Sequence, residues 1–169
     1  RELFGDDTPI APTFDIAWDA WAYPFGIKPQ FTFAKDSNGY HIETQIEDLS
    51  EELDKLRGGG HYFEKEKTER KIAFAQEVFG DILPVRMIMG SLTGAITNPL
   101  VCLMSMENYF LSMYDCPDEL HELMDFSTRV YEEYYDFLEK EKLLLPTCGT
   151  SPIAQESFAF NNELPTENV

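Results

Sequence analysis

A single carboxylate interrupts an apolar stretch near the start of the chain. Asp15 stands between Phe14 and Ile16 in the segment IAPTFDIAW. A short apolar run bounded by Pro or Gly is typical of a buried strand, and a lone carboxylate there is costly to desolvate unless it has a partner or a chemical role. Asp15 therefore has either a partner or a chemical role, and it is a candidate for catalysis. The alternative is that it caps a helix that begins near Trp18.

A cation occupies a comparable position further along the chain. Arg86 lies within ILPVRMIMG, residues 82–90, a continuous apolar run typical of a strand covered on both faces. Because a charge there needs a partner, Arg86 either binds an anionic group of a substrate or pairs with an acid on a covering helix. Gly90 is the last residue of this run, and Ser91 is the first residue after it. Both are candidates for close approach to the same ligand, so we group them with Arg86 as substrate-binding residues.

The remaining candidate ligands lack a metal-binding pattern. The chain has three Cys and three His, with no C-x-x-C spacing and no shared ligand spacing among the imidazoles. This pattern predicts neither a structural zinc site nor a disulfide framework, and it favours a reducing, cytoplasmic compartment. We expect no cofactor in this chain.

The composition excludes two classes of partner. The net charge is −18, from 31 acidic and 13 basic residues, whereas nucleic acids and anionic membrane surfaces require a basic footprint. A membrane span is not expected either, because the longest apolar stretch falls short of about 20 residues. With 43% hydrophobic residues, the 169-residue chain can form one domain with a sizeable core, and its expected partner is a small-molecule substrate.

The apolar patterns predict strands that alternate with helices. A β-hairpin is expected near 31–46, because alternating residues flank the turn sequence DSNG. Residues 18–23 predict a short helix or turn, and 46–57 a short acidic helix. Three further strands are expected at 8–15, 82–90 and 143–148. Three further helices are expected at 64–79, 99–114 and 117–142. This order is typical of βαβ units with a parallel sheet, and therefore of the α/β class.

Four segments of the sequence form a recognisable set. They are Thr13–Phe14–Asp15–Ile16, Phe25–Gly26, Met89–Gly90–Ser91–Leu92–Thr93 and the segment Met113–His121 before a long helix. Together they resemble the uroporphyrinogen decarboxylase superfamily, which also contains corrinoid-linked methyltransferases. The resemblance implies a (β/α)8 TIM barrel. It also implies that Asp15 faces the pyrrole nitrogens of a substrate and stabilises a protonated intermediate.

The chain departs from this family in ways that bear on its extent and its activity. It lacks the Arg-rich N-terminal motif of the decarboxylases, and SLTGAITNPL stands where their active-site tyrosine would be. A complete barrel needs about 250 residues. We therefore expect residues 1–169 to be one domain, the N-terminal half of a longer barrel cut at both ends.

Three functions are consistent with these observations. The first is a carboxy-lyase acting on a carboxylated tetrapyrrole or a relative. The second is a methyltransferase of the same superfamily, with zinc and a corrinoid in the full-length protein. The third is a non-catalytic partial barrel that serves as an interaction module. Half a barrel leaves unpaired sheet edges, so we also expect a homodimer.

Overall fold

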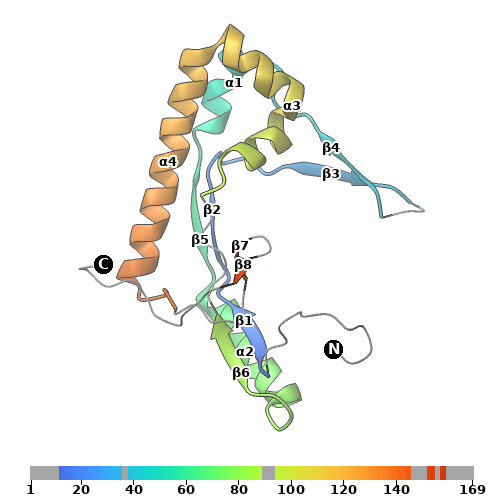
Figure 1. Cartoon of the computed structure of the whole chain (residues 1–169), viewed down its shortest axis with the longest axis vertical. Coiled ribbons are helices and arrows are strands. Elements are labelled where there is room, and N and C mark those ends of the chain that lie inside the picture. The colour runs from blue at the N-terminus through green and yellow to red at the C-terminus, as the bar shows by residue number, and fades with distance from the viewer. Residues whose placement is uncertain (1–11, 36–37, 89–93, 146–151, 155–156, 159–169) are drawn as a thin grey trace. The chain divides into compact units, whose positions relative to one another are not determined.

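The chain divides into two compact units, each of mixed α/β structure. The computed structural model describes residues 12–35, 38–88 and 94–145, together with the backbone of 152–154 and 157–158. Unit 1 comprises residues 1–20, 63–93 and 138–169, and unit 2 comprises residues 21–62 and 94–137. Figure 1 labels the helices and strands of both units.

Unit 1 is built around a pair of parallel strands. Strand β1, Phe14–Ala17, pairs with β6, Val85–Ile88, in the register Phe14↔Val85 to Ala17↔Ile88. The parallel pairing predicted from the element order is confirmed. Both strands are shorter than predicted: residues 12–13 of the 8–15 run form a bend, and 82–84 of the 82–90 run lie in a turn. Residues 8–11 and 89–90 lie outside the described part of the chain.

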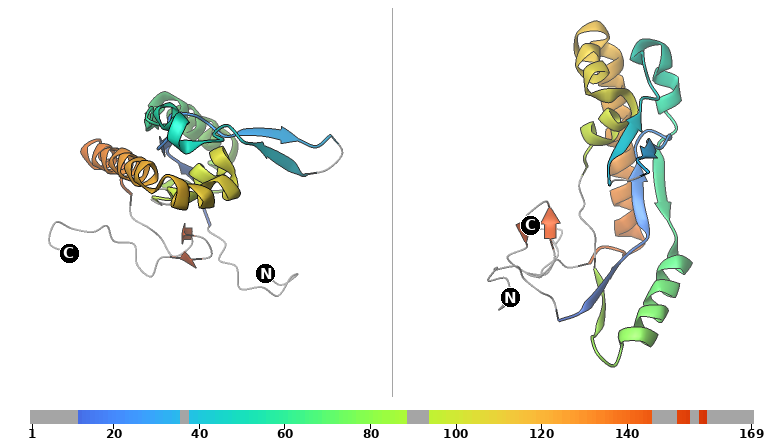
Figure 2. Two further views of the ribbon diagram at one scale, coloured as in Figure 1. Left: turned by 90° about the horizontal axis from the view of Figure 1, so that it is seen from above. Right: turned by 90° about the vertical axis from the view of Figure 1, so that its right-hand side faces the viewer.

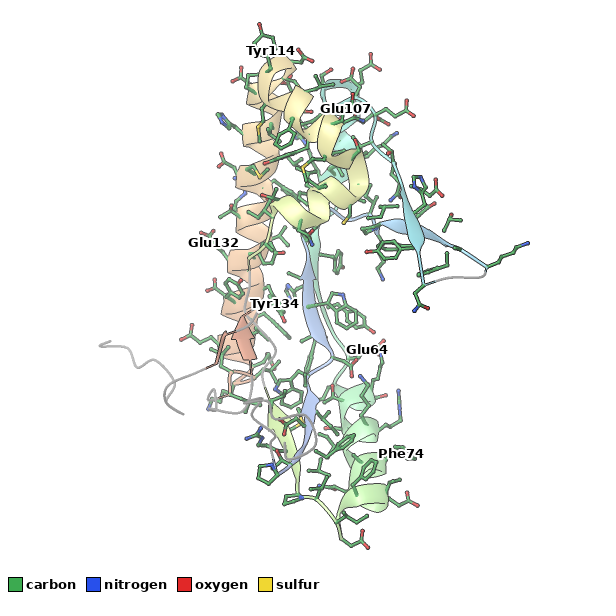
Figure 3. The ribbon with its side chains drawn as sticks, turned by 45° about the vertical axis from the view of Figure 1, so that its right-hand side comes forward. Glu64, Phe74, Glu107, Tyr114, Glu132 and Tyr134 are labelled. Carbon is green, nitrogen blue, oxygen red and sulfur yellow. The ribbon has the colours of Figure 1, made fainter. Side chains whose placement is uncertain are left out.

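Helix α2, Lys65–Phe79, covers one face of this strand pair (Figure 1). The ring of Phe14 stacks on that of Phe79 with a centroid distance of 4.6 Å, so Phe14 and Ile16 face the helix. Because side chains alternate along a strand, Asp15 and Ala17 face away from α2. The outer face of α2 is open to solvent, as the 66% exposed ring of Phe74 shows (Figure 3).

The prediction of a third parallel strand at 143–148 is wrong for the residues of this range that the structure describes. Residues 143–145 form no strand, and 146–148 lie outside the described residues. The amide of Leu143 donates to the carbonyl of Leu138 at 2.9 Å, and Lys142 has φ = 57°. This is the Schellman ending of a helix, and it uses residues that would otherwise start a strand. The C-terminal strands β7, Pro152–Ala154, and β8, Ser157–Phe158, pair antiparallel.

Unit 2 contains the predicted hairpin and an unpredicted strand pair. Strands β3, Gln30–Phe33, and β4, Tyr40–Glu43, pair antiparallel and extend away from the helices of their unit (Figure 1), which confirms the hairpin. Residues 18–23 were expected as a short helix or turn, but Ala20–Tyr23 form β2, which pairs with β5, Gly60–Phe63. A Cβ at Gly59 would lie 2.2 Å from the carbonyl oxygen of Pro24, so only glycine fits where the chain enters β5.

The core of unit 2 lies among its helices. They are α1, Leu49–Glu52, the 3₁₀ helix η1, Leu53–Leu56, α3, Thr97–Asp115, and α4, Pro117–Lys140. Buried side chains from all four, including Leu49, Leu56, Leu103 and Leu123, form one cluster. Figure 2 shows α1 beside α3 and α4. The helices predicted at 46–57, 99–114 and 117–142 are therefore confirmed to within a few residues at their ends.

The α/β class is confirmed, but a closed barrel is not present in the described residues. Their strands form four two-stranded sheets. Among the described helices, none is long and apolar enough to cross a bilayer.

Candidate functional site

The two charged residues predicted separately from the sequence form one ion pair. Asp15 and Arg86 occupy directly paired positions on β1 and β6. Arg86 Nε donates to Asp15 Oδ1 at 3.0 Å, and the guanidinium NH2 group donates to Oδ2 at 2.6 Å. Such a two-point contact between guanidinium and carboxylate is strong and sets the orientation of both groups. Thr13 Oγ1 donates a further hydrogen bond of 2.7 Å to Oδ1.

This pair lies on the strand face opposite α2 and is partly open to solvent. The side chain of Asp15 is 20% exposed and that of Arg86 is 31% exposed. The next side chain on the same face of β1 is Ala17, about 7 Å further along the strand.

The position of Asp15 corrects two details of the sequence interpretation. Strand β1 runs on to Ala17, so Asp15 is its second residue rather than its last. No helix begins near Trp18, because the chain continues into β2, and the capping alternative is therefore wrong. Arg86 does have an acidic partner, but the acid lies on the neighbouring strand rather than on a covering helix.

The proposed substrate contacts of Gly90 and Ser91 lie outside the described residues. Their role stays a prediction from the sequence.

A second carboxylate, which the sequence analysis did not single out, is held more firmly than Asp15. Asp19 is 7% exposed. Lys71 Nζ lies 2.7 Å from Oδ1 and 2.6 Å from Oδ2, and Lys67 Nζ lies 3.3 Å from Oδ1. The hydroxyl of Thr68 accepts from the Asp19 amide at 2.9 Å, and the Asp19 carbonyl accepts from the amide of Glu64 at 2.9 Å.

These contacts make Asp19 a structural anchor. Hydrogen bonding from Lys71, and secondarily from Lys67, lowers the pKa of the Asp19 carboxyl against the opposing effect of burial. Every partner belongs to the start of α2 or precedes it, so Asp19 ties the segment after β1 to this helix. The spacing of Lys67 and Lys71 on one helical face was the available signal, but it does not identify which of 31 acids is the partner.

No metal centre is present in the described part of the chain. Among those residues, no group of three or more His, Cys, Asp or Glu side chains could hold a metal ion.

Comparison with known proteins assigns no family. No family model, no curated protein and no solved structure matches the chain. The sequence motifs and the geometry of the Asp15–Arg86 pair are therefore the features of this chain that bear on its function.

Proposed function

We propose that this chain forms part of a uroporphyrinogen-decarboxylase-like (β/α)8 barrel, in which Asp15 serves a carboxy-lyase reaction on a carboxylated tetrapyrrole or a relative. The observation that carries the proposal is the Asp15–Arg86 pair on the strand face opposite α2. In a (β/α)8 barrel the crossover helices lie outside, so the opposite strand face lines the interior.

The parallel pairing of β1 with β6 supports this architecture. Helix α2 directly precedes β6 and contacts both strands, as the helix of a βαβ crossover unit does, although residues 21–62 of unit 2 also lie between β1 and α2 in the chain. Barrel enzymes place their chemistry toward the carboxyl ends of the strands. Asp15 lies one side-chain layer below that end, beneath the small side chain of Ala17.

The chemistry requires a carboxylate held in one direction in a site of low polarity. A protonated pyrrole ring that develops during decarboxylation is a cation, and a preoriented carboxylate stabilises it more strongly than water can. Arg86 and Thr13 hold both oxygens of Asp15, so no reorganisation is needed when this charge develops. Arg86 is then a positioning residue for Asp15.

The ion pair also supports the methyltransferase alternative, because it engages an arginine that could otherwise bind a substrate carboxylate. The chain contains five arginines, and Arg86 is already bound to Asp15, while Arg57 and Arg70 contact Asp54, Glu122 and Glu66. Few guanidinium groups are left for a substrate with many carboxylates. A methyl transfer between a corrinoid protein and a thiol needs no such set.

The test compares two carboxylates of one segment in the full-length protein. Asp15→Asn removes the charge from the proposed site, and Asp19→Asn removes it from the α2 anchor. We expect Asp15→Asn to reduce the turnover number for porphyrinogen decarboxylation by about 100-fold or more. This is the size of effect that the loss of one electrostatic contact to a transition state produces. Asp19→Asn should lower the thermal midpoint and leave the turnover of the folded enzyme within a few-fold.

Each other outcome has a defined meaning. Equal turnover in Asp15→Asn and the wild type would contradict a catalytic role. Methyl transfer to a thiol, with bound zinc and no porphyrinogen turnover, would identify the methyltransferase. Absence of both activities in the full-length protein would favour the interaction module.

A further inference from the structure

An aromatic pocket lies within unit 2, and the proposed function does not use it. Its volume is about 420 Å³, and the residues that line it include the aromatic residues Trp21, Tyr23, Phe25, Phe31 and Tyr131 together with Leu103. Small-molecule sites have volumes of about 300–1,000 Å³ and are mostly apolar, with a few polar groups that orient the ligand. The size and the lining of this pocket, hereafter the Trp21 pocket, match that description.

The walls of the pocket are held by contacts outside it. Trp21 packs against Tyr62 of β5 with a centroid distance of 4.3 Å, and Phe25 and Leu103 are each 1% exposed. The hydroxyl of Tyr131 lies 3.4 Å from the carbonyl oxygen of Ala95, and burial raises its pKa. The pocket therefore needs little rearrangement to receive a flat apolar group.

One cation lines this pocket. Lys28 is exposed, and no carboxylate of the described residues lies within ion-pair distance of its ammonium group. Its backbone carbonyl accepts a hydrogen bond of 3.0 Å from the side-chain amide of Gln45, which holds this segment in place. In a chain with 31 acids and 13 bases, an ammonium group without an acidic partner beside an aromatic pocket is complementary to an anion.

We propose that the Trp21 pocket binds a small, flat aromatic anion, with its rings against the exposed side chains of Trp21 and Phe31 and its acidic group at Lys28. Stacking on aromatic walls supplies the apolar contact, and Lys28 selects a negatively charged ligand over its neutral counterpart. A proline-rich peptide also binds aromatic grooves, but it needs no cation at the edge of the groove. All the lining residues belong to unit 2, so the proposal does not depend on the function of Asp15.

The test uses two dyes that share one ring system. Anilinonaphthalene sulfonate carries a negative charge, and N-phenyl-1-naphthylamine is its neutral counterpart. Titrations of the full chain, followed by dye fluorescence and by quenching of tryptophan emission, give both dissociation constants. We expect one dye per chain. Lys28→Gln should weaken the sulfonate dye about three- to ten-fold and change the neutral dye less than two-fold.

Two further variants separate the pocket from general dye binding. Lys35→Gln removes a charge from an exposed lysine outside the pocket and should change neither constant. Ala22→Phe adds a ring to the pocket wall and should weaken both dyes, and an unchanged circular dichroism spectrum shows that this variant folds.

Several results would overturn the proposal. They are no binding of either dye to the wild type, equal effects of Lys28→Gln and Lys35→Gln, and equal loss of both dyes in Lys28→Gln. Displacement of the dye by a proline-rich peptide, or by raising the protein concentration, would identify a peptide or a second copy of the chain as the occupant. Both of these results contradict a small-molecule site.

Discussion

Asp15 and Asp19 stand four residues apart and show two ways in which the chain stabilises a partly buried carboxylate. Asp15 forms a two-point ion pair with one arginine on the neighbouring strand. Asp19 is bound by two lysines and lies close to the hydroxyl of Thr68, 3.4 Å from its Oδ2. The sequence identified Asp15 because it stands alone in an apolar run, whereas Asp19 lies between two aromatic segments and looks like a turn residue. Its partners are about 50 positions away, so no local pattern reveals them.

The lysine anchor of Asp19 predicts a pH dependence of stability. The pKa of Asp19 is lowered in the folded state, so its contribution is fully present above the unfolded value of about 3.9 and is lost as the pH falls through the folded pKa. Lys71→Met should lower the free energy of unfolding by about 1–3 kcal/mol at pH 7. The difference between variant and wild type should shrink below pH 4. Urea unfolding between pH 2 and pH 7 measures both effects.

Lys65→Met provides the matched control for this lysine. Lys65 contacts Glu69 at 3.9 Å on the exposed side of α2, with both side chains more than half exposed. An ion pair of this kind contributes about 0–1 kcal/mol. Equal losses in the two variants at every pH would contradict the assignment of Asp19 as a buried anchor.

At the scale of elements, helices were predicted more accurately than strands. The periodicity of α4 and the proline at its first position define that helix locally. Strands β2 and β5 were missed because they are four residues each and pair across nearly 40 positions, so their stability comes from a distant partner. The parallel β1–β6 pair was predicted from element order, but no local pattern distinguishes a strand of four residues from a longer apolar run.

No feature of the sequence predicts the break inside α3. Ser105 has φ = 69° and ψ = 162°, a region that is nearly restricted to glycine, and neither Pro nor Gly stands nearby. The carbonyl of Leu103, released from the helix, accepts from the amides of Gln45 and Ile46 at 2.7 and 3.1 Å. Ser105 Oγ accepts from the Asn108 amide at 3.2 Å and so caps the second part of the helix. The segment after β4 therefore stabilises the break.

Substitutions at Ser105 should separate backbone strain from capping. Ser105→Gly relieves the strained φ and, because glycine is a tolerable N-cap, should leave stability unchanged or raise it by up to about 1 kcal/mol. Ser105→Ala keeps the strain, loses the cap and should lower stability by about 1 kcal/mol. Thermal and urea unfolding compare the two variants. Equal destabilisation by Gly and Ala would show that the positive φ of Ser105 carries no strain.

At the scale of the whole molecule, exposed apolar side chains and the net charge act in opposite directions. Strands β1 and β6 form a two-stranded sheet, and no third strand joins it among the described residues. Exposed apolar side chains on α3 include Phe110, 57% exposed, and Leu111, 52% exposed. Exposed apolar patches favour association, whereas a charge of −18 opposes it.

We therefore predict that the 169-residue chain forms a salt-dependent homodimer. Sodium chloride screens the repulsion between acidic subunits, and the screening length shortens by about 10 Å or more between 0.02 and 0.5 M salt. Over this range the average mass in sedimentation equilibrium should rise toward that of a dimer. A monomer at every salt and protein concentration would contradict the predicted association, and with it the half-barrel interpretation.

The most direct measurement is the turnover of the full-length protein with the pair reversed, Asp15→Arg combined with Arg86→Asp. The reversed pair keeps an ion pair between the same two strand positions, so it should recover most of the stability that either single change removes. If the carboxylate at position 15 serves the reaction, decarboxylation stays as low as in Asp15→Asn while the thermal midpoint returns toward the wild-type value. Turnover that returns together with stability would show that Asp15 serves only as the structural partner of Arg86.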